Sequence, residues 1–246
     1  MIMMVINKKK LKRIILWILA MILVLSGIAF LINRSTDKAT FELITSSQLP
    51  YNTGTKQGSN YVALTCNVDL GWESEYVEGI LDALEKEKVK ITFNVTGRWA
   101  EKNQELLLKI KSKGHEIGNH GHRHLDYANL SYEENLEQIK TSKSIIEDIT
   151  KESTKFFQAP SGSFGEGTMK AATELGYTCI KWDIDTIDWK NRQEPEVIIE
   201  RVKKKDIKEN SIVLMHPTYA TTQCIDDIIH IIREKGLTPG KLSDVF

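Results

Sequence analysis

Three of the chain's six histidines stand at alternate positions in the segment 118–126, which reads GNHGHRHLD. They are His120, His122 and His124. Two neutral imidazoles with one carboxylate make a ligand set that suits Zn²⁺ and leaves a coordination position for water or substrate. On its own, a run of this kind on a loop is more often a solvated, incidental cluster than a metal site. The elements that position these histidines must decide between the two interpretations.

From Tyr61 onward, short apolar runs alternate with amphipathic helical patterns. This alternation predicts an α/β domain with a parallel sheet, either a barrel or an open doubly wound sheet. The expected strands read YVALTCNV (61–68), KITFNV (90–95), HEIGNH (115–120), FFQAP (156–160), TCIKWDID (178–185) and SIVLMH (211–216). Helices are expected over residues 75–88, 104–113, 168–175, 195–205 and 223–235, and another begins at Ser131, where SYEE is a capping box.

Residues that could bind a ligand or take part in a reaction follow the ends of these strands. They are Asn67, Asp69, His120, His124, Pro160, Gly162, Asp183, Asp185, Asp188 and His216. In parallel α/β folds the carboxyl ends of the strands form the edge at which ligands bind. Residues this far apart in the sequence are therefore expected to converge on one mouth.

In this order the motifs resemble those of the NodB-type polysaccharide deacetylases, carbohydrate esterase family 4. The family's first motif, T-F-D-D-G with a D-x-D variant, appears as TCNVDLG, and the second as GNHGHRHLD. The third, R-x-P-x-G, appears as QAPSG, the fourth as DIDTIDW, and the fifth, L-x-L-x-H, as IVLMH. The resemblance covers residues 61–246 and implies a (β/α) barrel of the NodB type.

The resemblance also implies roles for individual residues. It implies metal binding by Asp69, His120 and His124, and it assigns no role to His122. It places Asn67 where the catalytic base should stand, makes His216 the general acid, and gives Asp185 the task of orienting His216. The substrate-binding residues that it implies are Pro160, Ser161, Gly162, Trp189 and Leu214, with a backbone N–H near Ser161 stabilising the oxyanion.

These roles fit a metal-dependent hydrolase. A divalent metal, Zn²⁺ in first place and Co²⁺ or another transition metal as alternatives, would polarise the acetyl carbonyl and lower the pKa of bound water. His216 would then protonate the leaving amide nitrogen. The expected activity is removal of N-acetyl groups from a cell-wall polysaccharide, with peptidoglycan as the expected polymer.

Two departures from the family pattern leave this activity open. Asn67 cannot take up a proton as an aspartate does, and Gln158 stands where the family has the arginine that pairs with that aspartate. The two changes are mutually consistent, because an amide pair can hydrogen-bond whereas a lone buried guanidinium would be left unpaired. The alternatives are a glycan-binding module of the same fold that keeps the metal but not the catalysis, and a membrane-tethered structural protein.

The first 60 residues differ in composition from the rest. They carry eight Lys or Arg against two acids, and a cluster of basic residues at positions 8–13 precedes a charge-free stretch from Ile14 to Ile32. Nineteen residues at about 1.5 Å each nearly span a membrane, so 1–13 is predicted as a cytoplasmic tail, 14–32 as a transmembrane anchor and 33–60 as a polar linker. The domain 61–246 would lie outside the cytoplasm. A cleaved signal peptide is the alternative, and it would release a secreted protein.

Charge and cysteine content narrow the remaining classes. The formal net charge is zero, which argues against a nucleic-acid partner. Three cysteines, Cys66, Cys179 and Cys224, indicate buried free thiols rather than a disulfide framework.

Overall fold

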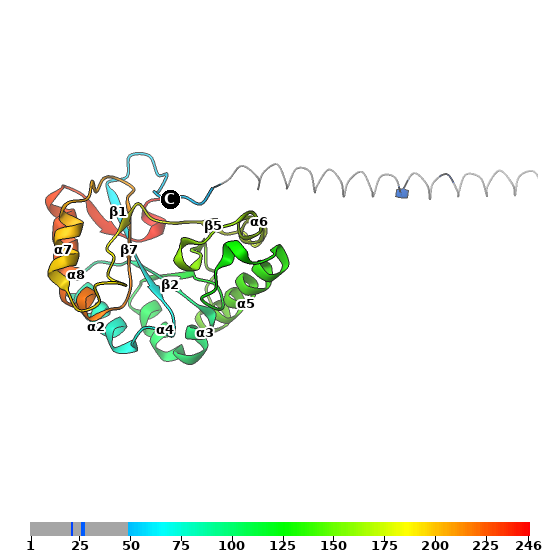
Figure 1. Ribbon diagram of the computed structural model, residues 1–246, viewed down its shortest axis with the longest axis horizontal. Coiled ribbons are helices and arrows are strands. Elements are labelled where there is room, and N and C mark those ends of the chain that lie inside the picture. The colour runs from blue at the N-terminus through cyan, green and yellow to red at the C-terminus, as the bar shows by residue number, and fades with distance from the viewer. Residues whose placement is uncertain (1–20, 22–25, 28–48) are drawn as a thin grey trace, which may run out of the picture. The chain divides into compact units, whose positions relative to one another are not determined.

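Eight parallel strands form the sheet at the centre of the computed structural model, which describes residues 21, 26, 27 and 49–246 (Figure 1). The strands are β1 (Tyr61–Val68), β2 (Thr92–Val95), β3 (Glu116–Asn119), β4 (Phe156–Phe157), β5 (Thr178–Cys179), β6 (Ile184–Asp185), β7 (Ile212–Met215) and β8 (Thr238–Gly240). Their order is β5-β4-β3-β2-β1-β7-β6, with β8 beside β1. The sheet is curled into a deformed barrel, in agreement with the expected α/β class.

Buried side chains on both faces explain the near-continuous apolar run of β1. Seven of its eight residues are buried, because neighbouring strands cover its edges and side chains of the core cover its faces. Cys66 lies in this strand, and all three cysteines are free and buried as expected.

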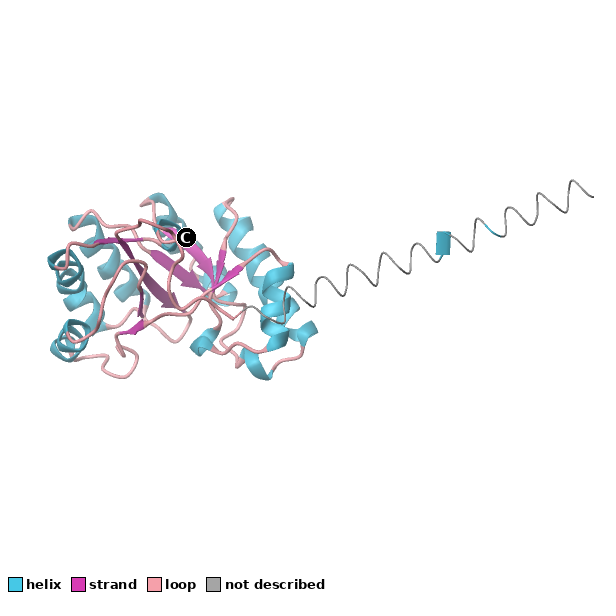
Figure 2. Ribbon diagram, turned by 90° about the horizontal axis from the view of Figure 1, so that it is seen from above, coloured by secondary structure: helices cyan, strands magenta, loops and turns pink. Residues whose placement is uncertain are grey.

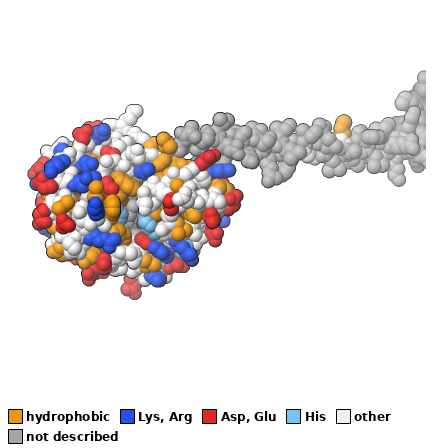
Figure 3. Space-filling model, in the orientation of Figure 1, with side chains coloured by type: hydrophobic (Ala, Val, Ile, Leu, Met, Phe, Trp, Pro, Cys, Tyr) orange, Lys and Arg blue, Asp and Glu red, His pale blue; other side chains and the backbone are white. Residues whose placement is uncertain are grey.

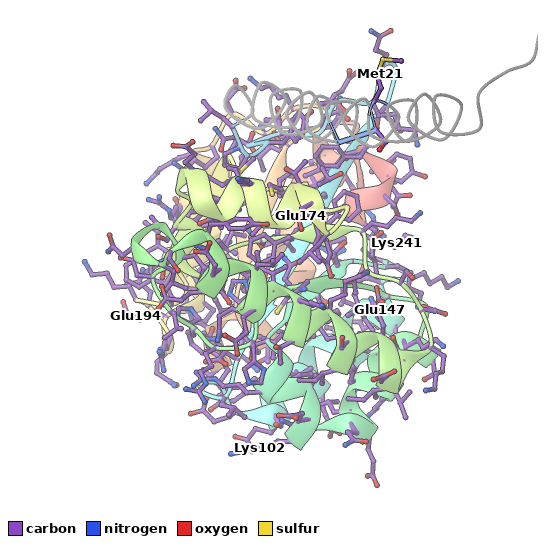
Figure 4. The ribbon with its side chains drawn as sticks, turned by 90° about the vertical axis from the view of Figure 1, so that its right-hand side faces the viewer. Met21, Lys102, Glu147, Glu174, Glu194 and Lys241 are labelled. Atoms are coloured by element: carbon purple, nitrogen blue, oxygen red, sulfur yellow. The ribbon has the colours of Figure 1, made fainter. Side chains whose placement is uncertain are left out.

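Helices surround the sheet, as Figure 2 shows. They are α2 (Ser74–Lys86), α3 (Gly97–Lys102), α4 (Gln104–Ser112), α5 (Tyr132–Thr150), α6 (Glu166–Glu174), α7 (Pro195–Lys203) and α8 (Tyr219–Glu234). The pairs α5 and α6, α7 and α8, and α2 and α8 pack together. Figure 4 shows one side of this helical layer, with Glu147 of α5 and Glu174 of α6 labelled.

All the expected helices of the domain are present. One further helix was not predicted, and one helix begins earlier than predicted. The capping box at Ser131 is formed with Glu134, so α5 begins where its sequence indicates. The short helix α3 was not expected. Helix α8 begins four residues before the predicted position 223, because the Thr218 hydroxyl accepts a hydrogen bond from the Thr221 N–H and caps the helix there.

The segment TCIKWDID was predicted as one strand, and this is wrong. It forms two short strands at opposite edges of the sheet, β5 beside β4 and β6 beside β7. Between them Ile180 bridges to Tyr51, and the Lys181 N–H donates to the Tyr51 carbonyl at 2.6 Å. The chain therefore crosses the opening between the two sheet edges in this segment.

Part of the predicted linker belongs to the domain. Tyr51 and Thr53 form bridges to Ile180 and Ser211, and the N–H of Gly54 donates to the Asn210 carbonyl at 2.7 Å. The predicted tail 1–13, residues 33–48 and all but three residues of the predicted span 14–32 lie outside the described residues. In the described part of the chain, no helix has the length and apolar content that crossing a membrane requires.

Candidate active site

The carboxyl ends of three strands of the same parallel sheet carry four of the predicted side chains. Asp69 follows β1, His120 and His124 follow β3, and His216 follows β7. The His120 and His124 rings are in contact, with 5.6 Å between centroids, and in addition to burial the charges of His124, His216 and Asp69 each shift the pKa of His120. Figure 3 shows histidine side chains near the middle of one face of the domain, bordered by hydrophobic and basic side chains. The mouth expected from the strand order is therefore formed.

His120 is buried and has a fixed ring orientation. Its Nδ1 lies 2.6 Å from the backbone oxygen of Gln158. Because a carbonyl oxygen only accepts hydrogen bonds, Nδ1 carries the proton and Nε2 keeps a lone pair. Burial, followed by the neighbouring His124, lowers the pKa of His120 to about 3, so the ring is neutral. The exposed His124 ring lies 5.6 Å away between ring centroids.

A tight turn after β3 sets the position of these rings. The Asn119 Oδ1 accepts a hydrogen bond from the Gly121 N–H at 2.7 Å. Gly121 has φ +76°, and a Cβ at this position would overlap the Tyr127 hydroxyl. Glycine is thus required both by the backbone conformation and by the close approach of the tyrosine.

His122 does not join the other two histidines. Its Nδ1 is buried and has no hydrogen-bond partner among the described residues. A Cβ on Gly97 would lie 2.8 Å from this atom, so the ring packs against the start of α3. This placement agrees with the absence of a role for His122 in the family pattern.

Asp69 is held by Thr96, the N-cap residue of α3, and by Arg98 in the first turn of that helix. The Arg98 Nε donates to Oδ1 at 2.8 Å and its Nη2 donates to Oδ2, while the Thr96 hydroxyl donates to Oδ1 at 2.7 Å. Burial raises the pKa of Asp69, but the hydrogen bonds from Arg98 and Thr96 outweigh burial and lower it to about 2. The carboxylate is therefore ionised, and both of its oxygens are engaged. Arg98 was not predicted as a site residue, although it stands only three residues after the end of the buried strand β2.

Asn67 belongs to a buried chain of three amides. The Asn94 Nδ2 donates to Asn67 Oδ1 at 2.9 Å and to Gln158 Oε1 at 2.5 Å. Asn67, Asn94 and Gly118 are in register on β1, β2 and β3, and a Cβ on Gly118 would overlap the Asn94 amide. Asn67 and Gln158 were expected to bond directly, but Asn94 lies between them. Its bridging position could be found only from the strand register.

Some polar atoms of this amide chain have hydrogen-bond partners and others do not. The Asn94 Oδ1 and the Gln158 Nε2 are buried and have no partner in the described residues. The Asn67 Oδ1 is occupied by Asn94, so the Asn67 side chain presents its NH₂ group as a free donor. Asn67 thus occupies the position of the family's base but has no group that can accept a proton.

The carboxylate that contacts His216 is Asp188. Its Oδ1 lies 2.8 Å from the His216 Nδ1, and its Oδ2 accepts from the His216 backbone N–H at 2.5 Å and from the Thr221 hydroxyl at 2.8 Å. Asp188 is fully buried. The arrangement fixes the ring through Nδ1 and leaves Nε2 as the atom that exchanges a proton with a ligand.

The prediction that Asp185 orients His216 is wrong, because the carboxylate at the His216 ring is that of Asp188. The Asp185 Oδ1 accepts from the Ile187 N–H at 2.7 Å, and its backbone oxygen accepts from the Arg201 Nε at 2.7 Å. Ile187 adopts φ +57°, so the chain turns sharply between the two aspartates. Asp185 stabilises this turn, and the turn carries Asp188 to His216.

Two further residues at His216 were overlooked. The Trp72 ring lies 5.0 Å from the His216 ring between centroids, at an interplanar angle of 34°. The Arg192 guanidinium lies 4.2 Å from the centroid of the Trp72 ring. Trp72 comes three residues after Asp69, and its position just past the first motif was the available signal.

The predicted substrate-binding residues occupy different environments. Pro160, Ser161 and Gly162 form a single 3-10 turn, with Ser161 at φ +55° and Gly162 at φ +64°. Leu214 is buried within β7, whereas Trp189 is 47% exposed. Trp189 can therefore pack against a ligand, and Leu214 contributes mainly to the core.

The residues present do not fit a divalent metal in this arrangement. His120 and His124 offer nitrogen lone pairs, but Arg98 and Thr96 engage both oxygens of Asp69. Over residues 49–246, no three His, Cys, Asp or Glu side chains are grouped so as to hold an ion. The predicted ligands are therefore neighbours, but the third is turned to a guanidinium.

The curled parallel sheet carries histidines and aspartates at its carboxyl edge, where parallel α/β proteins bind their ligands. Residues 54–180 match the family described as polysaccharide deacetylase. The chain is 32% identical over 190 residues to a peptidoglycan-N-acetylglucosamine deacetylase of Bacillus cereus, covering 75% of this chain and 68% of that protein. The chain belongs to the polysaccharide deacetylase family.

Some other similar proteins are not named as deacetylases. An uncharacterized protein of Bacillus subtilis, YlxY, is 35% identical over 178 residues, which are 72% of this chain and 55% of the relative's length. The wild-type structure of a pseudoenzyme of carbohydrate esterase family 4 from Bacillus anthracis is 37% identical, with a TM-score of 0.76 over 81% of this chain and 69% of that one. A mutant of this pseudoenzyme, described as having restored enzymatic activity, aligns with the same TM-score at 36% identity, over 81% of this chain and 71% of that one.

Proposed function

We propose that this domain binds an N-acetylated cell-wall polysaccharide, most directly peptidoglycan, and that it hydrolyses the acetamide slowly or not at all. The observation that carries the proposal is the state of Asn67. Its oxygen is occupied by Asn94, and it presents an NH₂ donor in the place of a base. A donor at this position can bind the carbonyl oxygen of an acetamide, but it cannot take a proton from water.

The polysaccharide ligand is supported by the names of the relatives and by the chemistry of the mouth. Several relatives are named peptidoglycan deacetylases. Trp189 is exposed, and the Trp72 ring lies against His216. Aromatic faces pack well against the apolar faces of sugar rings, because both surfaces leave water on contact. Hydrogen-bonding groups beside them supply the specificity.

The second candidate is an active deacetylase, and the pair of His216 and Asp188 favours it. Nδ1 of His216 is held by a buried carboxylate, and this is the arrangement that a general acid needs. General-base assistance contributes about 10²–10⁴-fold in rate, so the absence of a base at position 67 would leave such an enzyme slow.

The location outside the cytoplasm is part of this proposal. An uncleaved anchor over residues 14–32 would place the domain next to the cell wall, where its polymer lies. Protease added to intact, wall-stripped cells should then cleave the domain and spare a cytoplasmic marker protein. Protection of the domain under these conditions would rule out this location.

The test combines binding with acetate release, using purified full-length protein in detergent. Wild-type protein should co-sediment with insoluble N-acetylated peptidoglycan, and chemically de-N-acetylated peptidoglycan should retain less of it. Acetate release should be at background for the wild type and should rise in the double variant Asn67→Asp/Gln158→Arg, which restores the family's pair. Release by the wild type that falls at least tenfold in His216→Ala would instead establish the second candidate. Failure to bind either polymer would refute the proposal.

A further inference from the structure

The Asp69 carboxylate is paired with a guanidinium at the mouth. Three donors reach its two oxygens, namely the Arg98 Nε and Nη2 and the Thr96 hydroxyl. The planar guanidinium matches the carboxylate in two parallel hydrogen bonds. Asp69 is 8% exposed at its side chain, so this pair is largely shielded from water on the acid's side.

The position of Arg98 is set by the backbone around it. Thr96 caps α3 by accepting from the Trp99 N–H, and Trp99 is buried in the core. The Arg98 N–H donates to the His122 carbonyl at 3.2 Å, which ties the first turn of α3 to the histidine loop. The first turn of α3 is therefore fixed by the core and by the histidine loop, and it holds the Arg98 guanidinium against Asp69.

A divalent cation and Arg98 would compete for the same two oxygens. Three donors leave the Asp69 carboxylate about one of its four lone-pair positions. A metal bound there would lie beside the guanidinium, a second positive charge that repels it, unless the Arg98 pair is broken. Without Asp69, His120 and His124 remain as two neutral ligands, which is fewer than the three protein ligands of a catalytic zinc site. The competition thus acts at the one charged ligand of the predicted set.

We propose that the Arg98 guanidinium is the resident cation of this site and keeps the affinity of Asp69, His120 and His124 for divalent transition metals low. The inference concerns the mouth of the proposed function but does not require that a glycan binds there. It goes beyond the loss of the base at position 67, because Arg98 acts on a different residue of the first motif.

The experiment measures Co²⁺ and Zn²⁺ binding by the full-length protein, using visible absorption of Co²⁺ and equilibrium dialysis for Zn²⁺. Arg98→Gln should bind both ions at least tenfold more tightly than the wild type. The matched control is Arg123→Gln, which removes an exposed charge from the loop that carries His124. Its metal affinity should change by less than about threefold, because exposed charges are screened by salt.

Two further variants assign the effect to Asp69. The double variant Arg98→Gln/Asp69→Asn should return to the weak affinity of the wild type, since the gain uses the freed carboxylate. Asp69→Asn alone should leave the wild-type affinity unchanged within about threefold, because the bidentate pair with Arg98 already occupies this carboxylate. This second comparison remains informative even if Arg98→Gln does not fold, as judged by circular dichroism.

Equal metal affinity in the wild type and Arg98→Gln would overturn the proposal, as would no binding by any variant. A tenfold loss of metal affinity in Asp69→Asn alone would also overturn it. Co-sedimentation of the wild type with peptidoglycan in the presence of EDTA is measured in parallel. Failure in that arm counts against the proposed function alone, since the metal comparison needs no glycan.

Discussion

The Nδ1 atom of His216 lies 2.8 Å from a carboxylate oxygen of Asp188, and this contact organises the far side of the mouth. Asp188 is fully buried and accepts two further hydrogen bonds, from the His216 backbone and from Thr221. One side chain therefore positions the ring, the end of β7 and the start of α8.

Asp188→Asn should lower the free energy of unfolding by about 1–3 kcal/mol, because an amide has one acceptor oxygen where the carboxylate has two. The matched control is Asp185→Asn, whose side chain accepts one hydrogen bond within a turn. It should cost less than about 1 kcal/mol. Urea unfolding followed by circular dichroism gives both values. An equal or larger loss in Asp185→Asn would contradict the assignment of Asp188 as the partner of His216.

The amide chain predicts a favourable coupling between positions 67 and 158. Asn67→Asp alone should destabilise the fold by about 1–3 kcal/mol, because it places a charge on a buried group whose neighbours are neutral amides. Adding Gln158→Arg should recover part of this loss by pairing the charge. A double-mutant cycle from urea unfolding should give a coupling of about 1–3 kcal/mol. A coupling near zero would mean that the two positions do not act on each other.

Gly121→Ala should be among the most damaging single substitutions. Its φ of +76° disfavours a side chain, and the added Cβ would overlap the Tyr127 hydroxyl. The expected loss is roughly 3 kcal/mol or more, the sum of backbone strain and overpacking. Gly176 is the control, since it has φ +81° but open space around it. Gly176→Ala should cost only about 1 kcal/mol. Thermal unfolding of the two variants and the wild type measures both losses. Similar losses for both variants would show that the tyrosine contact is unimportant.

His115 predicts a specific sensitivity to acid. Burial, then the nearby Lys90 and Lys113, lowers the pKa of His115 from 6.5 to about 4. Between these values the unfolded chain binds a proton that the folded chain does not, so stability rises with pH in this window and falls on acidification. His115→Gln keeps an acceptor for the Ile91 N–H but cannot titrate.

The slope of unfolding free energy against pH, measured from pH 6.5 to 4, should therefore be shallower in His115→Gln by about 1 kcal/mol per pH unit. The buried His120, with its pKa lowered to about 3, contributes to the same slope and should leave part of it in the variant. An unchanged slope in His115→Gln would refute the contribution of this residue.

Much of the fold followed from local pattern. The strand β1, the helices α2 and α4 and the start of α5 were predicted to within a few residues, because apolar periodicity and the Ser131 capping box are local signals. The division of TCIKWDID into β5 and β6 was missed. Its apolar pattern is that of one strand, and only the opening between the sheet edges determines that the chain crosses there.

The sequence by itself determined the family. It also determined the order in which the motifs follow the predicted strands, and the presence of Asn67 where a base is expected. These properties depend on residue type and spacing, which the chain carries directly. Tertiary structure alone decided which groups touch: Asp188 rather than Asp185 at His216, Asn94 between Asn67 and Gln158, and Arg98 on Asp69. Such contacts depend on strand register, on the left-handed turn at Ile187 and on the entry of α3, where a shift of a few ångströms exchanges one partner for another.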